Sequence, residues 1–149
     1  MKNALLAIFL FGGSILFLLF IGQNVGPTSP LFPVQRLDES LLYITKRTPE
    51  AKVAYYQYLI QKRFYDIANV VKLQHEDLLV AVSLRYSTTV GKAVQISSTN
   101  NVHTSQLKKE LEQQKKSLEN IVAHYTSIDK RQKYIQDAIN YIDIYERKL

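Results

Sequence analysis

Hydrophobic residues recur along most of this chain at three- and four-residue intervals, after an N-terminal run that is apolar throughout. The intervals place the apolar side chains of four segments on one face of a helix each. These stripes comprise Val53, Tyr56, Ile60, Phe64, Ile67 and Val71; Leu78, Val82, Tyr86, Val90 and Ala93/Val94; Leu107, Leu111, Gln114, Leu118, Ile121 and Tyr125; and Ile128, Ile135, Ala138, Ile142, Tyr145 and Leu149. No segment alternates as a strand would. The pattern predicts an all-α fold, a small antiparallel bundle of helical hairpins.

Local signals set the expected ends of these helices. Thr48-Pro49-Glu50 predicts a helix start, with Thr48 as the cap and Pro49 in the first turn. Over residues 72–77 the stripe is interrupted, so the helix either continues or breaks near Gln74-His75; we favour a break. The polar run of residues 97–101 predicts a loop. In the third stripe the four–three spacing is that of a heptad seam, typical of a coiled coil, and Gln114 is its one polar member.

The first 22 residues have the composition of a transmembrane signal anchor. Residues 4–21 carry no charge and only one polar side chain, Ser14. As a helix this run would be about 27 Å long, close to the roughly 30 Å of a bilayer's hydrocarbon core. Lys2 precedes the run and the next charge is Arg36, so the positive-inside rule predicts a single-pass cell-membrane protein with a cytoplasmic N-terminus and residues 23–149 outside the cytoplasm. A cleaved signal peptide is the alternative, although no A-x-A-like site follows the run.

Residues 23–33 are expected to form a proline-rich spacer, and residues 34–149 an extracytoplasmic helical domain. Pro27, Pro30 and Pro33 recur every third residue, which favours extended chain and excludes continuous helix. A short helix should begin at Pro33 and end near Lys46, with Leu37 and Leu41 facing the body of the domain. Leu31 and Phe32 lie one turn ahead of that face. We therefore expect these two side chains to dock on the bundle rather than enter lipid or hold a partner.

Charge and composition narrow the classes of partner. The chain has a formal net charge of +6 and contains no Cys, so neither a disulfide nor a lipoprotein anchor is expected. Outside the proposed anchor the positive surplus is spread along the sequence, which argues against a nucleic-acid partner. Anionic lipid head groups or wall polymers suit a mildly basic domain at this location.

The sequence predicts no catalytic, cofactor or metal site. His75, His103 and His124 have no partner at the spacing of a metal site, and no G-x-S-x-G frame marks a nucleophile. Gly91-Lys92 lacks the rest of a phosphate-binding loop. We therefore predict that the protein is not an enzyme.

One stretch carries a family resemblance. Gly26-Pro27-Thr28-Ser29-Pro30-Leu31-Phe32-Pro33-Val34-Gln35-Arg36 resembles the G-x-x-L-[YF]-P-[LV]-[KQ]-R opening of an uncharacterised bacterial family of membrane-anchored or exported helical domains. The residues 48–52, TPEAK, and 61–64, QKRF, match its following helix start and Arg-bearing helix, so the resemblance covers about residues 26–72. Gln35 stands where Lys is usual and Phe32 where Tyr is commoner. The resemblance implies an envelope helical module, often encoded beside sigma-factor or envelope-regulatory genes.

Together these features predict a non-enzymatic, membrane-anchored envelope protein whose outer helical domain binds a protein or cell-wall partner. An envelope chaperone or stress-sensor module is the alternative. The candidate docking or interaction residues are Leu31, Phe32, Pro33, Arg36, Glu39 and Arg63. Among these, Arg36 and Glu39 are placed to pair with Arg63 or with acidic groups of the next helix.

Overall fold

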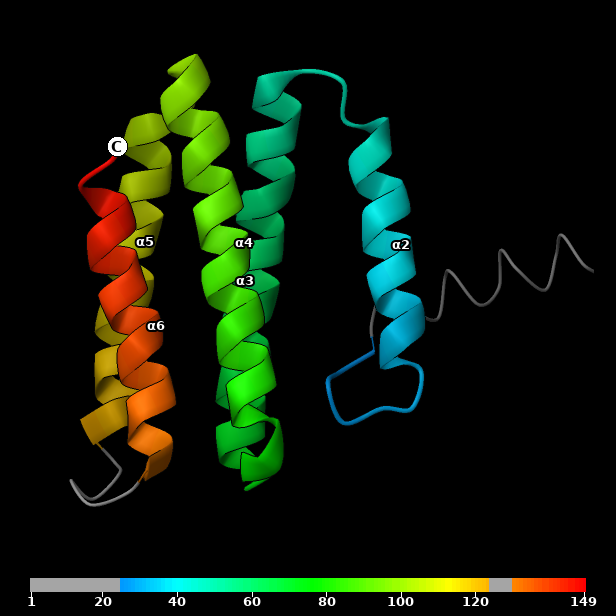
Figure 1. Cartoon of the computed structure of the whole chain (residues 1–149), viewed down its shortest axis with the longest axis vertical. Helices are drawn as coiled ribbons and strands as arrows, with labels where there is room; N and C mark the ends of the chain where they lie inside the picture. The colour runs from blue at the N-terminus through cyan, green and yellow to red at the C-terminus, as the bar shows by residue number, and fades with distance from the viewer. Residues whose placement is uncertain (1–24, 124–129) are drawn as a thin grey trace, which may run out of the picture. The chain divides into compact units, whose positions relative to one another are not determined.

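The computed structural model describes residues 25–123 and 130–149, and every regular element in those ranges is a helix. The elements are α2 (Phe32–Thr45), α3 (Pro49–Lys72), the short 3-10 helix η1 (Glu76–Leu78), α4 (Leu79–Asn100), α5 (Thr104–Ala123) and α6 (Lys130–Glu146) (Figure 1). The chain divides into two compact units, residues 1–45 and 46–149. The predicted all-α class is confirmed for the described residues.

The described part of the first unit is a turn followed by α2. Two successive turns precede the helix, in which the Ser29 amide donates to the Gly26 carbonyl and the Phe32 amide to the Ser29 carbonyl, each at 3.1 Å. The expected extended spacer is therefore folded back on itself in this part. The Gln35 side-chain amide adds a 2.8 Å hydrogen bond to the Val25 carbonyl. The predicted anchor, residues 4–21, lies outside the described residues; among the helices that are described, none combines the length and the apolar character of a membrane span.

The expected inward face of α2 is wrong. Leu37 and Leu41 are 65% and 53% exposed, whereas the buried positions of this helix are the polar residues Gln35 and Asp38. Burial of Gln35 has a local reason, because its amide satisfies the Val25 carbonyl. The apolar stripe of α2 is therefore not its buried side.

In the second unit, α3 runs antiparallel to α4 and α5 antiparallel to α6, whereas α4 and α6 run in the same direction (Figure 1). Helix α3 packs mainly against α4, α4 also packs against α6, and α6 packs against α5. The predicted start of α3 is confirmed: Thr48 Oγ1 accepts a 3.2 Å hydrogen bond from the Ala51 amide, and Pro49 lies in the first turn. The favoured break is confirmed as well, since α3 ends at Lys72 and Gln74 has a left-handed φ of 57°.

The predicted loop over residues 97–101 is wrong, because α4 continues to Asn100. Polar side chains here bond to the helix backbone instead of ending it: Asn100 Nδ2 donates to the Ile96 carbonyl at 2.8 Å. The next residue, Asn101, caps the helix with a left-handed φ of 53°, and His103 has the same φ. The connection between α4 and α5 is thus only three residues long.

The stripes supply most of the core, with departures at several positions; in the first stripe Phe64 and Val71 are only partly buried. Leu107, Leu111, Gln114 and Leu118 are buried as the seam predicts, but the next buried residue is Val122, and Ile121 is partly exposed. Tyr125 and Ile128 lie outside the described residues. Leu79 rather than Leu78 is buried at the start of α4, and Tyr145 and Leu149 are partly exposed. The buried apolar side chains are Val53, Tyr55, Tyr56, Leu59, Ile60, Ile67, Val70, Leu79, Val82, Tyr86, Val90, Ala93, Val94, Leu107, Leu111, Leu118, Val122, Ile135, Ala138, Ile139 and Ile142.

Candidate functional site

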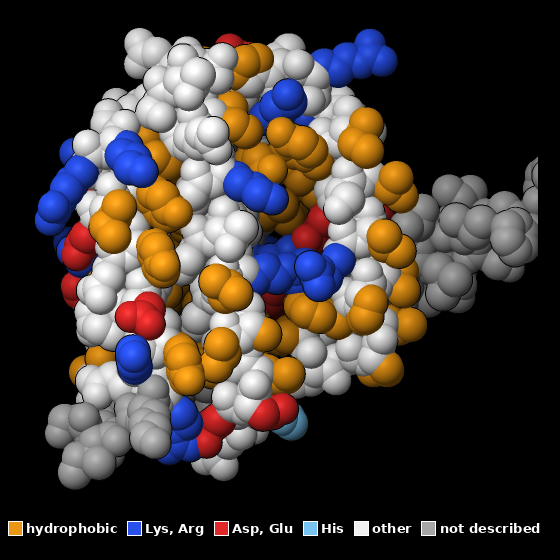
Figure 2. All heavy atoms as spheres, in the orientation of Figure 1, with side chains coloured by type: hydrophobic (Ala, Val, Ile, Leu, Met, Phe, Trp, Pro, Cys, Tyr) orange, Lys and Arg blue, Asp and Glu red, His pale blue; other side chains and the backbone are white. Residues whose placement is uncertain are grey.

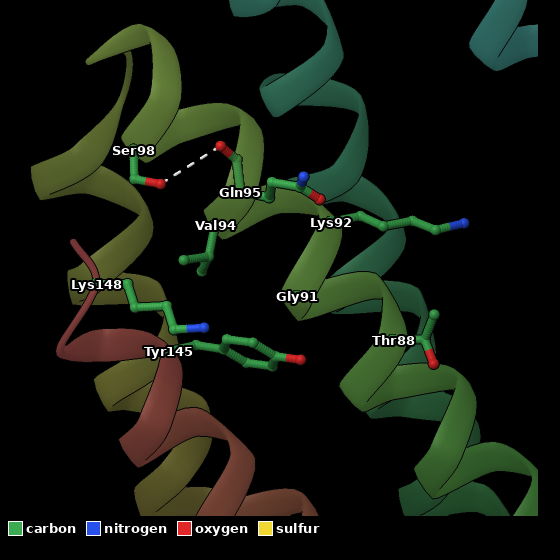
Figure 3. Close-up of a pocket in the computed structure, with 8 residues that line it drawn as sticks. All are labelled: Thr88, Gly91, Lys92, Val94, Gln95, Ser98, Tyr145 and Lys148. Atoms are coloured by element: carbon green, nitrogen blue, oxygen red, sulfur yellow. Dashed lines mark hydrogen bonds between the residues drawn. The ribbon is translucent and has the colours of Figure 1, made fainter.

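A pocket of about 500 Å³ lies between α4 and α6 (Figure 3). Helix α4 lines it with residues spaced three and four apart, which share one face of a helix. From the C-terminal end of α6 come two residues, Tyr145 in its last turn and Lys148 just after it. The lining residues are Thr88, Gly91, Lys92, Val94, Gln95, Ser98, Tyr145 and Lys148.

Gly91 is the reason that the two helices meet as they do here. A Cβ atom at this position would lie only 2.6 Å from the Tyr145 hydroxyl oxygen and 2.8 Å from Cζ of the same ring. The missing side chain therefore leaves room for the Tyr145 ring, which extends toward α4 (Figure 3). Sequence reasoning missed this contact because Gly91 was considered only as part of a phosphate loop. The available signal was an isolated glycine within a helical pattern, which often has a packing reason.

The pocket is lined by polar side chains and carries positive charge beside an aromatic ring. The ammonium group of Lys148 lies 5.4 Å from the centre of the Tyr145 ring, within the range of a cation–π contact. Tyr145 in turn stacks on Tyr141, with ring centres 6.2 Å apart. Lys92 extends from the opposite wall, away from Tyr145 (Figure 3). Among the described lining residues there is neither a carboxylate nor an imidazole. This set of groups suits the binding of a polar, negatively charged group.

Exposed apolar side chains continue from the pocket along the same faces of the two helices. Leu84 precedes Thr88 by one turn and is 63% exposed, and Tyr141 precedes Tyr145 by one turn and is 43% exposed. Val80 and Tyr134 are exposed one and two turns further along. Figure 2 shows hydrophobic side chains gathered over α4 and α6 on this side, with Lys and Arg side chains among them. We call Val80, Leu84, Tyr134 and Tyr141 the α4–α6 apolar face.

A layer of polar side chains crosses the interior of the bundle. The hydroxyl of Tyr86 on α4 donates to Gln114 Oε1 on α5 at 2.7 Å. Gln114 Nε2 then donates to Glu110 Oε1 at 3.4 Å, and Gln57 Nε2 on α3 donates to Glu110 Oε2 at 3.0 Å. The layer thus joins three helices through one buried hydroxyl, two amides and one carboxylate.

Burial governs the electrostatics of this layer. It raises the pKa of the Glu110 carboxyl above its ordinary value, and the hydrogen bond from Gln57 only partly offsets that effect. Burial also raises the pKa of the Tyr86 hydroxyl, with the carboxylates of Glu110 and Glu146 adding to the shift. The Tyr86 hydroxyl is therefore a hydrogen-bond donor throughout the physiological pH range. It is held in place by its bond to Gln114 rather than poised to ionise.

The residues expected from the sequence to form an interaction site fall into both units. Leu31, Phe32, Pro33, Arg36 and Glu39 surround the start of α2; Pro33 and Arg36 are exposed and the other three partly buried. Arg63 belongs to α3, is 1% exposed, and forms an ion pair with Asp66 at 3.3 Å. Burial raises the pKa of the Asp66 carboxyl despite this pairing. Docking of Phe32 and pairing of Arg36 or Glu39 with Arg63 stay predictions.

No described group of three or more His, Asp and Glu side chains is arranged to hold a metal ion. His75 and His103 are exposed, and His124 lies outside the described residues. Comparison of the chain with protein-family models, with curated proteins and with solved structures finds no match.

Proposed function

We propose that this chain is a non-enzymatic, membrane-anchored envelope protein whose outer helical domain binds a protein or cell-wall partner. The apolar run of residues 4–21 and the single Lys2 before it support the anchor and its orientation. The resemblance over residues 26–72 to a family of envelope helical domains favours the same assignment. The binding role depends on a separate observation in the bundle.

That observation is the pocket between α4 and α6. Lys148 lies beside the Tyr145 ring, and Lys92 extends from the opposite wall. The side-chain amide of Gln95 and the Tyr145 hydroxyl also line the pocket, whereas the hydroxyls of Thr88 and Ser98 donate to carbonyl groups of α4. Hydrogen-bond donors placed beside positive charge favour an acidic group on the partner, and the charge-assisted bonds formed there are stronger than neutral ones. The adjoining α4–α6 apolar face adds area that a larger partner would cover. Acidic side chains of a protein and the anionic groups of a wall polymer both satisfy this chemistry.

The test is capture of the partner from detergent-solubilised membranes of the native host, with the full chain as bait. Lys92→Glu combined with Lys148→Glu should abolish capture, because the pocket would then repel an acidic group. Lys109→Glu combined with Lys116→Glu makes the same charge change at exposed positions of α5 and should leave capture intact. Equal loss in both double variants would refute the pocket as the binding site. Failure of the unmodified chain to capture any protein or polymer would refute the binding role itself.

The exposed side chains of the α4–α6 apolar face favour one second candidate, an envelope chaperone or stress-sensor module. A chaperone needs exposed apolar surface to hold an unfolded client, and Leu84 and Tyr141 provide it. Purified protein should then slow the aggregation of a denatured client, and Leu84→Ser with Tyr141→Ser should remove that effect. No protection at an excess of the protein would eliminate this candidate.

A further inference from the structure

Helix α2 carries an exposed apolar stripe. Leu37, Leu41 and Ile44 are 65%, 53% and 74% exposed. With 100° between successive residues, their side chains fall within an arc of about 60° on the helix surface. Three large aliphatic side chains on one narrow arc differ from the single exposed apolar residues that are common on protein surfaces. We call these three residues the α2 stripe.

The chain holds the α2 stripe near the end of the proposed anchor. Only the residues 22–31 separate Ile21 from the first residue of α2, which limits the distance between them to about 40 Å even in fully extended chain. The two turns at Gly26–Ser29 and Ser29–Phe32 shorten that reach. If residues 4–21 span the bilayer, α2 starts close to its outer surface.

The charges around the stripe fit a lipid surface. Arg36 is exposed at the edge of the stripe, and Glu39 lies on the opposite side of the helix. The chain as a whole is positively charged, at +6. A helix with one apolar face, a basic edge and acidic groups turned away has the pattern of an interfacial helix, which binds with its apolar face between the head groups and the acyl chains.

We propose that the α2 stripe lies in the outer membrane–water interface, with a bilayer containing anionic lipid as its partner. The inference depends on the proposed function, because the anchor brings α2 to the membrane. The stripe then fixes α2 parallel to the surface, and the second unit follows it directly along the chain.

The absence of cysteine from the sequence allows a site-specific test in the full-length protein. A nitroxide spin label is attached at Leu41→Cys, and at Lys109→Cys as a control at an exposed position of α5 in the second unit. The protein is reconstituted in vesicles of phosphatidylcholine and phosphatidylglycerol, and flotation is measured first. Collisions of the label with oxygen, which concentrates in lipid, and with a water-soluble nickel chelate then report its depth.

The label at position 41 should collide more with oxygen than with nickel, at a depth of about 5–10 Å below the head groups. The label at position 109 should show the opposite preference. Adding Leu37→Ser and Ile44→Ser should move the label at position 41 into water. Vesicles that float with the protein but leave label 41 open to nickel, or shielded from both reagents, would overturn the interfacial placement and leave the anchor standing. Protein that does not float would overturn the anchor and the placement together.

Discussion

Replacing Tyr86 with Phe should destabilise the bundle although it removes only one oxygen atom. The hydroxyl donates to Gln114 Oε1 at 2.7 Å, and both side chains are buried, with Tyr86 fully covered. The phenylalanine ring would fill the same volume, so no large cavity forms. The loss is that of the hydrogen bond, and it leaves the Gln114 oxygen without its donor in a site that water does not reach.

The expected magnitude follows from that unpaired oxygen. Leaving a buried acceptor unsatisfied costs about 1–3 kcal/mol. In a unit of about 100 residues each kcal/mol lowers the melting temperature by about 4–8 °C. Gln114→Leu should cost a similar amount, since it leaves the Tyr86 hydroxyl without an acceptor. When both residues are replaced, neither polar group remains, and the double variant should be more stable than the sum of the single effects predicts, by about 0.5–3 kcal/mol.

The stability of the unmodified chain, the two single variants and the double variant is measured by thermal unfolding of the detergent-solubilised proteins, followed by far-UV circular dichroism. Tyr58→Phe is the matched control, because Tyr58 on α3 is 54% exposed and its hydroxyl is in reach of water. The control should change stability by less than about 0.5 kcal/mol. A Tyr86→Phe variant as stable as the control, or additive effects of the two replacements, would show that the bond is not a source of stability.

Three further predictions concern other parts of the bundle. Burial raises the pKa of the Glu110 carboxyl above 4.5, so the folded state binds this proton more tightly than the unfolded chain. The free energy of unfolding should therefore fall as pH rises from about 4.5 through the raised pKa. Urea titrations at several pH values measure this pH dependence, and Glu110→Gln should reduce it. Gly91→Ala places a Cβ atom against Tyr145, so the ring must move and partner capture should fall while the helix content stays unchanged, whereas Thr88→Ala should retain the Tyr145 position. Thr48→Ala should lower stability by about 0.5–2 kcal/mol through loss of the bond to the Ala51 amide, and Thr48→Ser should restore most of it; equal stability of the two variants would contradict the capping role.

Periodicity and capping signals predicted the helices well because both act over a few neighbouring residues. The stripe before Lys72, the cap at Thr48 and the break near Gln74 are all present in the structure. The third stripe shows where a strict heptad fails: a straight α-helix has 3.6 residues per turn, so a repeat of seven drifts around the helix. After two heptads, counted from Leu107, that drift has moved the buried position from Ile121 to Val122.

The features that sequence reasoning missed depend on contacts between distant residues. Polar residues 97–101 predicted a loop, but the side chains of Ser98 and Asn100 donate to carbonyl groups of the preceding turn, and the helix continues to Asn100. The pocket needs Gly91 and Tyr145, which are 54 positions apart, to meet across two helices. The exposure of Leu37 and Leu41 was missed because a stripe reports that one face is apolar and does not report what covers that face.

The polar layer also favours one register of α5 against α4 over registers shifted by a helical turn. Leucine-lined helices can slide by a full turn, about 5.4 Å, and still present leucine to leucine. If α5 moved by one turn relative to α4, Leu111 or Leu118 would replace Gln114 opposite Tyr86, and the tyrosine hydroxyl would be enclosed by hydrocarbon. Glu110 would at the same time lose the amide of Gln57. A single glutamine in an otherwise aliphatic seam thus specifies the register of α5 against α4, because it disfavours shifted registers that hydrophobic packing alone would allow.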